Sequence, residues 1–185
     1  VPMLNARYTH TMNNFRFQLA GTYLSYDLEQ AGMPDASIDC YSIQLGARAT
    51  FGPLRLSGAI YYAQNNEQMG FSAAGTNDGY LMDGFGNIID NDTIGWALVA
   101  NYKLNDMLEF QIGYATIDSE WDSANAESDD DESYYLQSKI TVAKGFYIVP
   151  EIGVNDQKQT GTADKTVAPS AEAGDNFYIG AKFQM

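Results

Sequence analysis

The chain has 185 residues, a size compatible with one domain, and a net charge of -14 from 24 acidic and 10 basic side chains. Such an acidic chain lacks the basic face that neutralises nucleic-acid phosphates, so nucleic-acid binding is excluded. Its longest apolar runs are about five residues, such as residues 96–100, whereas a transmembrane helix needs about 20. Membrane-spanning helices are therefore excluded, and the single cysteine, Cys40, excludes an internal disulfide and is expected at a rim.

Apolar and polar residues alternate with a period of two along most of the chain, and no stretch has helical periodicity. The alternation is plain where Phe17 and Leu19 alternate with Arg16 and Gln18. The expected strands cover residues 2–10, 15–26, 39–51, 54–64, 93–104, 107–118, 133–143, 146–155 and 176–185. The sequence therefore predicts an all-β chain of about nine strands.

The connections between these strands alternate between short and long. The short ones, of hairpin size, are residues 11–14, 52–53, 105–106 and 144–145. The long ones, rich in Gly, Asp, Asn, Ser and Ala, are residues 27–38, 65–92, 119–132 and 156–175. Transmembrane barrels have strands of about 10 residues, short periplasmic turns and long outer loops. The pattern predicts an antiparallel up-and-down transmembrane β-barrel with its C-terminus in the periplasm and its acidic loops outside.

The charges inside the strands predict which face of each strand meets lipid. Apart from acids at strand edges such as Asp39 and Asp118, they all take the phase opposite to the apolar one, and a Lys or Arg facing lipid at mid-bilayer costs roughly 2 to 4 kcal/mol. Because a slip of one residue would invert every side chain, the phase is well determined. The residues expected to line a polar interior are Arg7, Arg16, Arg48, Arg55, Lys103, Glu109, Lys139, Glu151 and Lys182. Those expected to face lipid are Phe17, Leu19, Leu45, Leu56, Trp96, Leu98, Phe110, Ile112, Ile140, Ile148, Ile179 and Phe183.

Aromatic residues gather at both ends of the expected strands, where they are typical of the two interfacial girdles of a barrel. Those near the long loops are Tyr23, Tyr62, Tyr114, Tyr134 and Phe177. Those near the short turns are Tyr8, Phe51 and Tyr102.

The ordered set of hairpins, including "YSIQLGARATFGPLRLSGAIYYAQN" (residues 41–65) and the terminal "NFYIGAKFQM" (176–185), resembles the outer-membrane porins of Gram-negative bacteria. The resemblance is strongest to their C-terminal half. It implies a water-filled channel for passive diffusion of small hydrophilic solutes and ions, a homotrimer, contacts with outer-membrane lipid and lipopolysaccharide, and no cofactor. In the family the last residue is usually Phe, whereas this chain ends in Met185, with Phe183 two residues before it. The family's inward-folded constriction loop would lie outside this chain.

The odd strand number bears on whether the barrel is complete, because single-chain bacterial barrels normally have an even number. We expect residues 1–185 to form one domain, the C-terminal part of a roughly 16-stranded barrel. The alternative is a complete eight-stranded barrel with residues 1–14 as an extension. It would have a structural, adhesion or partner-sheathing role and no open pore. Side chains would fill its interior, where an excess of bases would lack partners.

Nothing in the sequence predicts catalysis, so the chain is not expected to be an enzyme. The only histidine, His10, falls in the lipid phase, which leaves a Ser-His-Asp arrangement without a base. Glu109 and Glu151 are interspersed with bases and are interpreted as wall charges. The loop residues Asp90, Asp92, Asp129, Asp130 and Asp131 could bind calcium, but they lack EF-hand spacing, so solvated loops are the preferred interpretation.

Overall fold

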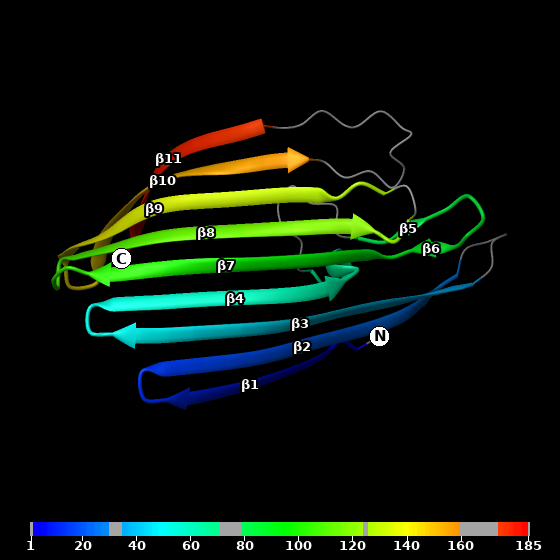
Figure 1. Cartoon of the computed structure of the whole chain (residues 1–185), viewed down its shortest axis with the longest axis horizontal. Coiled ribbons are helices and arrows are strands. Elements are labelled where there is room, and N and C mark those ends of the chain that lie inside the picture. The colour runs from blue at the N-terminus through cyan, green and yellow to red at the C-terminus, as the bar shows by residue number, and fades with distance from the viewer. Residues whose placement is uncertain (1, 30–34, 71–78, 124–125, 160–173, 185) are drawn as a thin grey trace.

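A nine-stranded antiparallel sheet, in which each strand pairs with its neighbour along the chain, dominates the structure (Figure 1). The structure is a computed structural model that describes residues 2–29, 35–70, 79–123, 126–159 and 174–184. Met185 and parts of all four long connections lie outside the described residues. The all-β antiparallel architecture expected from the sequence is confirmed. Among the described residues, no helix has the length and apolar character needed to cross a bilayer.

The strands of the sheet follow the alternating segments of the sequence closely. They are β1 (Leu4–Met12), β2 (Phe15–Leu28), β3 (Ala36–Phe51), β4 (Leu54–Gln64), β7 (Asn91–Lys103), β8 (Leu108–Trp121), β9 (Asp129–Ala143), β10 (Phe146–Gln159) and β11 (Gly174–Gln184). The connection between β4 and β7 adds a 3-10 helix, η1 (Asn66–Met69), and a small ribbon of β5 (Leu81–Met82) and β6 (Ile88–Ile89). The expected loop at residues 65–92 is therefore partly structured.

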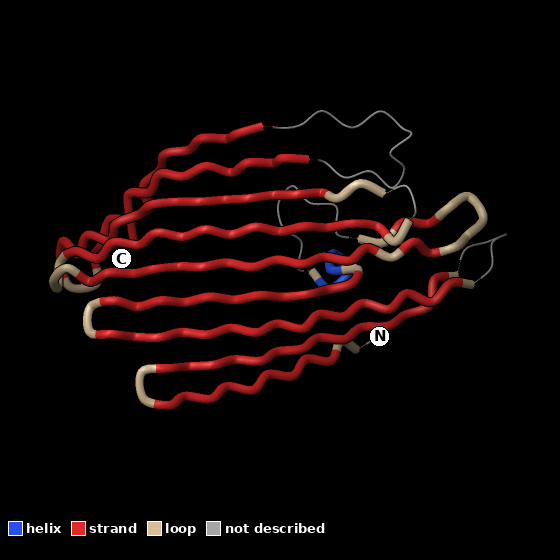
Figure 2. Tube along the Cα trace, in the orientation of Figure 1, coloured by secondary structure: helices blue, strands red, loops and turns tan. Residues whose placement is uncertain are grey.

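All four short turns lie at one end of the sheet, and the described parts of the long connections lie at the other (Figures 1 and 2). Three of the turns need a residue with positive φ, namely Asn13 (φ 50), Gly52 (φ 57) and Gly145 (φ 83). Tight hairpins favour Gly and Asn at such positions because other residues strain there. The turn residues therefore explain why the chain reverses so sharply at this end, which we call the turn end.

The strands extend further at the loop end than the sequence predicted. The acidic run from Asp129 to Glu132 was wrongly assigned to a loop and instead begins β9, while β3 begins at Ala36 and β10 continues to Gln159. Hairpins that project beyond a bilayer have water on their outer side, so their residues need not alternate between apolar and polar. The alternation of apolar and polar residues therefore ends before the strand itself ends.

The first strand is an integral part of the sheet and not an extension to an eight-stranded barrel. It pairs with β2 along its whole length, from Leu4 opposite Tyr23 to Met12 opposite Phe15. The prediction that residues 2–10 form a strand is confirmed, with a shift of two residues. Over the residues that the structure describes, the alternative interpretation of residues 1–14 as an extension is not favoured.

Candidate functional site

Strand register brings the nine predicted wall charges onto one face of the sheet. Arg16 lies directly opposite Arg48, and Glu109 lies between Lys103 and Lys139. In an antiparallel pair, directly opposed residues project from the same face, and alternate residues of a strand share that face. Following these pairings from β1 to β11 places the following on one side, which we call the charged face: Arg7, Arg16, Arg48, Arg55, Lys103, Glu109, Lys139, Glu151 and Lys182.

The twelve residues expected to face lipid all lie on the opposite side, which we call the apolar face. Direct pairs such as Leu19 with Leu45 and Ile148 with Phe183 show the shared side. Several are widely exposed, with Leu98 at 58%, Ile112 at 59% and Ile179 at 77%. Soluble monomers rarely expose so many large apolar side chains on one face, so this face indicates a lipid or protein environment.

The sheet is curved (Figure 1), and side-chain exposure assigns the charged face to its inner, concave side. On it, Asn101 is only 6% exposed, whereas Leu98 on the apolar face is 58% exposed. Side chains crowd together on the inside of a curved sheet and spread apart on the outside. The charged side chains therefore converge on a common space, and the apolar ones point away from it.

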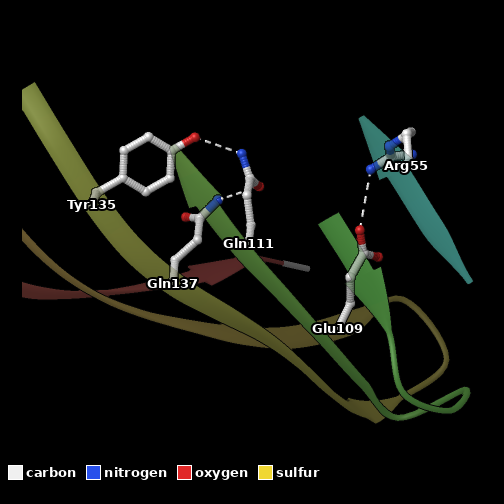
Figure 3. Close-up of polar contacts among 5 residues, drawn as sticks. All are labelled: Arg55, Glu109, Gln111, Tyr135 and Gln137. Atoms are coloured by element: carbon white, nitrogen blue, oxygen red, sulfur yellow. Dashed lines mark hydrogen bonds and ion pairs between the residues drawn. The ribbon is translucent and has the colours of Figure 1, made fainter. Parts of the chain in front are cut away.

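Positive charge is unevenly distributed over the charged face. Strands β1 to β4 contribute only arginines to the wall charges, whereas β7 to β11 contribute three lysines and two glutamates. One ion pair crosses between the two groups, from Arg55 Nη2 to Glu109 Oε1 at 3.1 Å (Figure 3). Both side chains are partly exposed, so this pair contributes no more than about 1 kcal/mol to stability. Glu109 offsets part of the positive charge at this point, and no ion pair is found for Arg16 or Arg48 within the described residues.

Beside this ion pair lies a row of uncharged polar side chains that the sequence reasoning missed. The Gln111 amide donates to the Tyr135 hydroxyl at 2.6 Å, and the Gln137 amide donates to Gln111 Oε1 at 2.6 Å (Figure 3). The sequence did contain a signal for this row, because both glutamines lie in the polar phase and alternate with apolar residues of β8 and β9. The row gives the middle of the charged face a hydrogen-bonded and uncharged surface.

Three tyrosines of the charged face lie against glycines of neighbouring strands. A Cβ built on Gly95, Gly113 or Gly153 would fall within 3.0 Å of a neighbouring tyrosine ring. The tyrosines are directly opposite in the register: Tyr61 with Gly95, Tyr135 with Gly113, and Tyr178 with Gly153. An aromatic ring over a strand glycine compensates for the missing side chain, so these pairs act as packing joints between strands.

The expected aromatic girdles lie on the apolar face at both ends of the strands. At the loop end, tyrosine hydroxyls donate to carboxylates nearer the rim: Tyr23 to Asp39 at 2.9 Å, Tyr62 to Asp92 at 2.9 Å and Tyr114 to Glu132 at 2.5 Å. These tyrosines have an apolar body and a polar tip directed away from the apolar band. Such amphipathic placement is typical of the boundary between hydrocarbon and headgroups.

The aspartates considered for calcium and the histidine considered for catalysis have defined surroundings in the described part of the chain. Within the described part of the chain, no group of three or more His, Cys, Asp or Glu side chains is placed to hold a metal ion. Asp90 and Asp92 instead accept hydrogen bonds from Asn65 and Tyr62, while Asp129 is buried. The imidazole of His10 belongs to the apolar face and stacks beside Tyr8, with ring centroids 6.5 Å apart.

Comparison with known proteins points to one class of structures. No protein-family model and no curated protein sequence matches the chain. Among solved structures, the outer membrane channel DcaP of Acinetobacter baumannii matches at a TM-score of 0.75 and 16% identity, over 100% of this chain and 52% of that one. The outer membrane protein OmpT of Vibrio cholerae matches at 0.62 and 14%, over 99% and 55%. The anion-selective porin from Comamonas acidovorans matches at 0.57 and 14%, over 98% and 46%.

The chain spans about half the length of each of these structures. At such low identity the likeness concerns the fold alone. This fold agrees with the charged inner face, the apolar outer face and the position of all four short turns at one end of the sheet. The chain therefore has the fold of the outer-membrane porins.

Proposed function

We propose that this chain forms part of the wall of a water-filled channel in a bacterial outer membrane, through which small hydrophilic solutes and ions diffuse passively. The observation that carries the proposal is the segregation of nine ionised side chains onto the concave face. If that face met lipid, each base near mid-bilayer would cost roughly 2 to 4 kcal/mol. A wet lumen keeps these groups hydrated, and the channel needs no catalytic step and no cofactor.

Within this proposal the channel prefers anions along the wall that the chain supplies. The nine wall charges are seven bases and two acids, a sum of +5, and Asp129 and Asp131 at the loop end of β9 share their phase and lower the sum over the strands to +3. Charged rings and pore radius set selectivity in such channels, and a low-dielectric wall focuses the field of its charges. The similarity in fold to a porin that is described as anion-selective also supports this preference. The acidic outer loops oppose this preference at the mouth.

The proposal also assigns an orientation and partners. The turn end, and with it the C-terminus, lies in the periplasm, because short turns are periplasmic in this class of barrel. The acidic loop end then faces outward, among lipopolysaccharide headgroups. The remaining strands come from a longer chain that completes a barrel of about 16 strands, and the complete protein is a homotrimer.

Reversal potentials in planar bilayers test the proposal directly. The protein purified from membranes is placed between unequal KCl concentrations, and we expect a potential that shows chloride preference. Replacing Arg16 and Arg48 by Gln should lower the chloride-to-potassium permeability ratio, whereas Lys144→Gln in a turn should change it little. Firm cation preference in the wild type would overturn the anion assignment, and a protein that inserts without conducting would overturn the channel.

A further inference from the structure

The described part of the connection between β4 and β7 begins with η1, which lies over the charged face at its loop end. There, Ile38 and Cys40 are both fully buried, beneath Met69 of η1, which is itself 6% exposed. Leu24 and Tyr26 of β2 pack against the same cluster. All four strand residues belong to the phase of Arg16 and Arg48, so the cluster occupies the inner face.

A buried asparagine fixes the start of this connection. Asn65 is fully buried and has a left-handed backbone (φ 52, ψ 49) that turns the chain out of β4. Its side-chain amide donates to the Asp39 carbonyl at 2.9 Å and to Asp90 Oδ1 at 2.7 Å. Its side-chain carbonyl accepts from the Asn91 amide at 3.0 Å, so one side chain joins β3, β4 and the start of β7.

The far end of the connection is tied to the sheet as well. The Trp121 indole donates to the Gly79 carbonyl at 2.9 Å, which attaches the segment to the end of β8. Nearby, Asn91, Thr93 and Ser119 form a buried hydrogen-bonded group that links β7 to β8. Buried polar groups with satisfied hydrogen bonds define one arrangement, because each alternative leaves some of them unpaired.

We infer that residues 65–70, with Tyr80 and Ile88 packed beside them, form a fixed cover on the inner wall, and that this cover sets how wide the channel is at its outer end. The inference rests on the proposed channel. A solute entering from the loop end meets the cover and not the strands beneath it. The family resemblance places a constriction loop outside this chain, whereas the cover is a second narrowing element that the chain itself supplies.

Cys40 provides a reporter for the cover because it is the only cysteine in the chain and lies directly beneath Met69. A charged methanethiosulfonate reagent is added to the folded wild-type protein in lipid vesicles, and modification is followed by mass. We expect slow modification in the wild type. Met69→Ser or Asn65→Ala should accelerate it by roughly tenfold or more, since local opening rises exponentially with lost stability. Met107→Ser, at an exposed turn position, is the matched control.

Single-channel conductance of the same variants separates the cover from the channel. Opening the cover by Met69→Ser should raise conductance, while Met107→Ser should leave it unchanged. Rapid labelling of wild-type Cys40 would overturn the cover whether or not the protein conducts. If wild-type Cys40 is protected but Met69→Ser and Asn65→Ala both leave the conductance unchanged, the proposed effect of the cover on channel width is overturned. Protected Cys40 in a protein that never conducts would support the cover's structure while overturning the proposed function and, with it, the width inference.

Discussion

Replacing Gly113 with alanine should destabilise the sheet through a single aromatic contact. A Cβ at Gly113 would lie 2.3 Å from Cε1 and 2.7 Å from the hydroxyl oxygen of Tyr135, which is closer than real Cβ contacts allow. The ring must therefore move, and its hydrogen bond from Gln111 is disturbed. Overpacking costs about 1 to 3 kcal/mol, and the lost hydrogen bond costs about 0.5 to 1.5 kcal/mol. The alanine stabilises by about 0.4 to 1 kcal/mol because it restricts the unfolded chain, so we expect a net loss of about 0.5 to 4 kcal/mol.

Urea unfolding in lipid vesicles, followed by tryptophan fluorescence, measures this loss. Gly46→Ala is the matched control, because it lies on the same face and its Cβ would meet no atom closer than 3.8 Å. We expect the control to be neutral or slightly stabilised. In a Tyr135→Ala background, Gly113→Ala should cost little, since the ring that it displaces is absent. Equal unfolding midpoints for Gly113→Ala and Gly46→Ala would refute the proposed joint.

Three further predictions concern the two faces and the outer ribbon. Leu98→Arg on the apolar face should destabilise the protein by roughly 2 to 4 kcal/mol relative to Val99→Arg on the charged face, and vesicle unfolding would show no difference if the faces were misassigned. Arg55→Ala frees Glu109 and removes one positive charge, so the anion preference in reversal potentials should fall with at most about 1 kcal/mol of lost stability. Hydrogen bonds from Asn87 hold the pKa of Asp83 below its usual value, so the stabilisation that they provide is present above about pH 4 and is lost as the pH falls through the lowered pKa. The Asn87 amide NMR signal should shift over that acid range and should stay constant in Asp83→Asn; an unchanged titration in the variant would contradict the assignment.

The strand pattern and its phase could be predicted from the sequence because alternation reports the local environment directly. Arg16 and Leu19 lie on opposite faces because successive side chains of a strand alternate between its two faces. The cost of placing a base in lipid then determines which face is turned toward the lipid. The nine predicted wall charges accordingly share one face in the structure. The strand ends were less predictable. Asp129 and its neighbours lie beyond the region in which lipid selects one face, so the acidic run resembled a loop.

The inward cover left only an indirect trace in the sequence. Toward the loop end, the phase that holds Arg16 and Arg48 becomes apolar, at Leu24 and Tyr26 of β2 and at Ile38 of β3. This change signals that the inner face is covered there. It does not identify the covering segment, because that depends on contacts with Met69, which is distant along the chain.

A series of antiparallel strands with one apolar and one charged side can be predicted from local sequence, because period-two alternation and hairpin turns are local properties. The strand register, the position of Tyr135 over Gly113, and the return of Asn65 and Met69 over the inner wall emerge only in the folded sheet. Those features depend on side chains that are far apart in sequence. Their hydrogen bonds and packing exist only once the sheet has curved and brought them together.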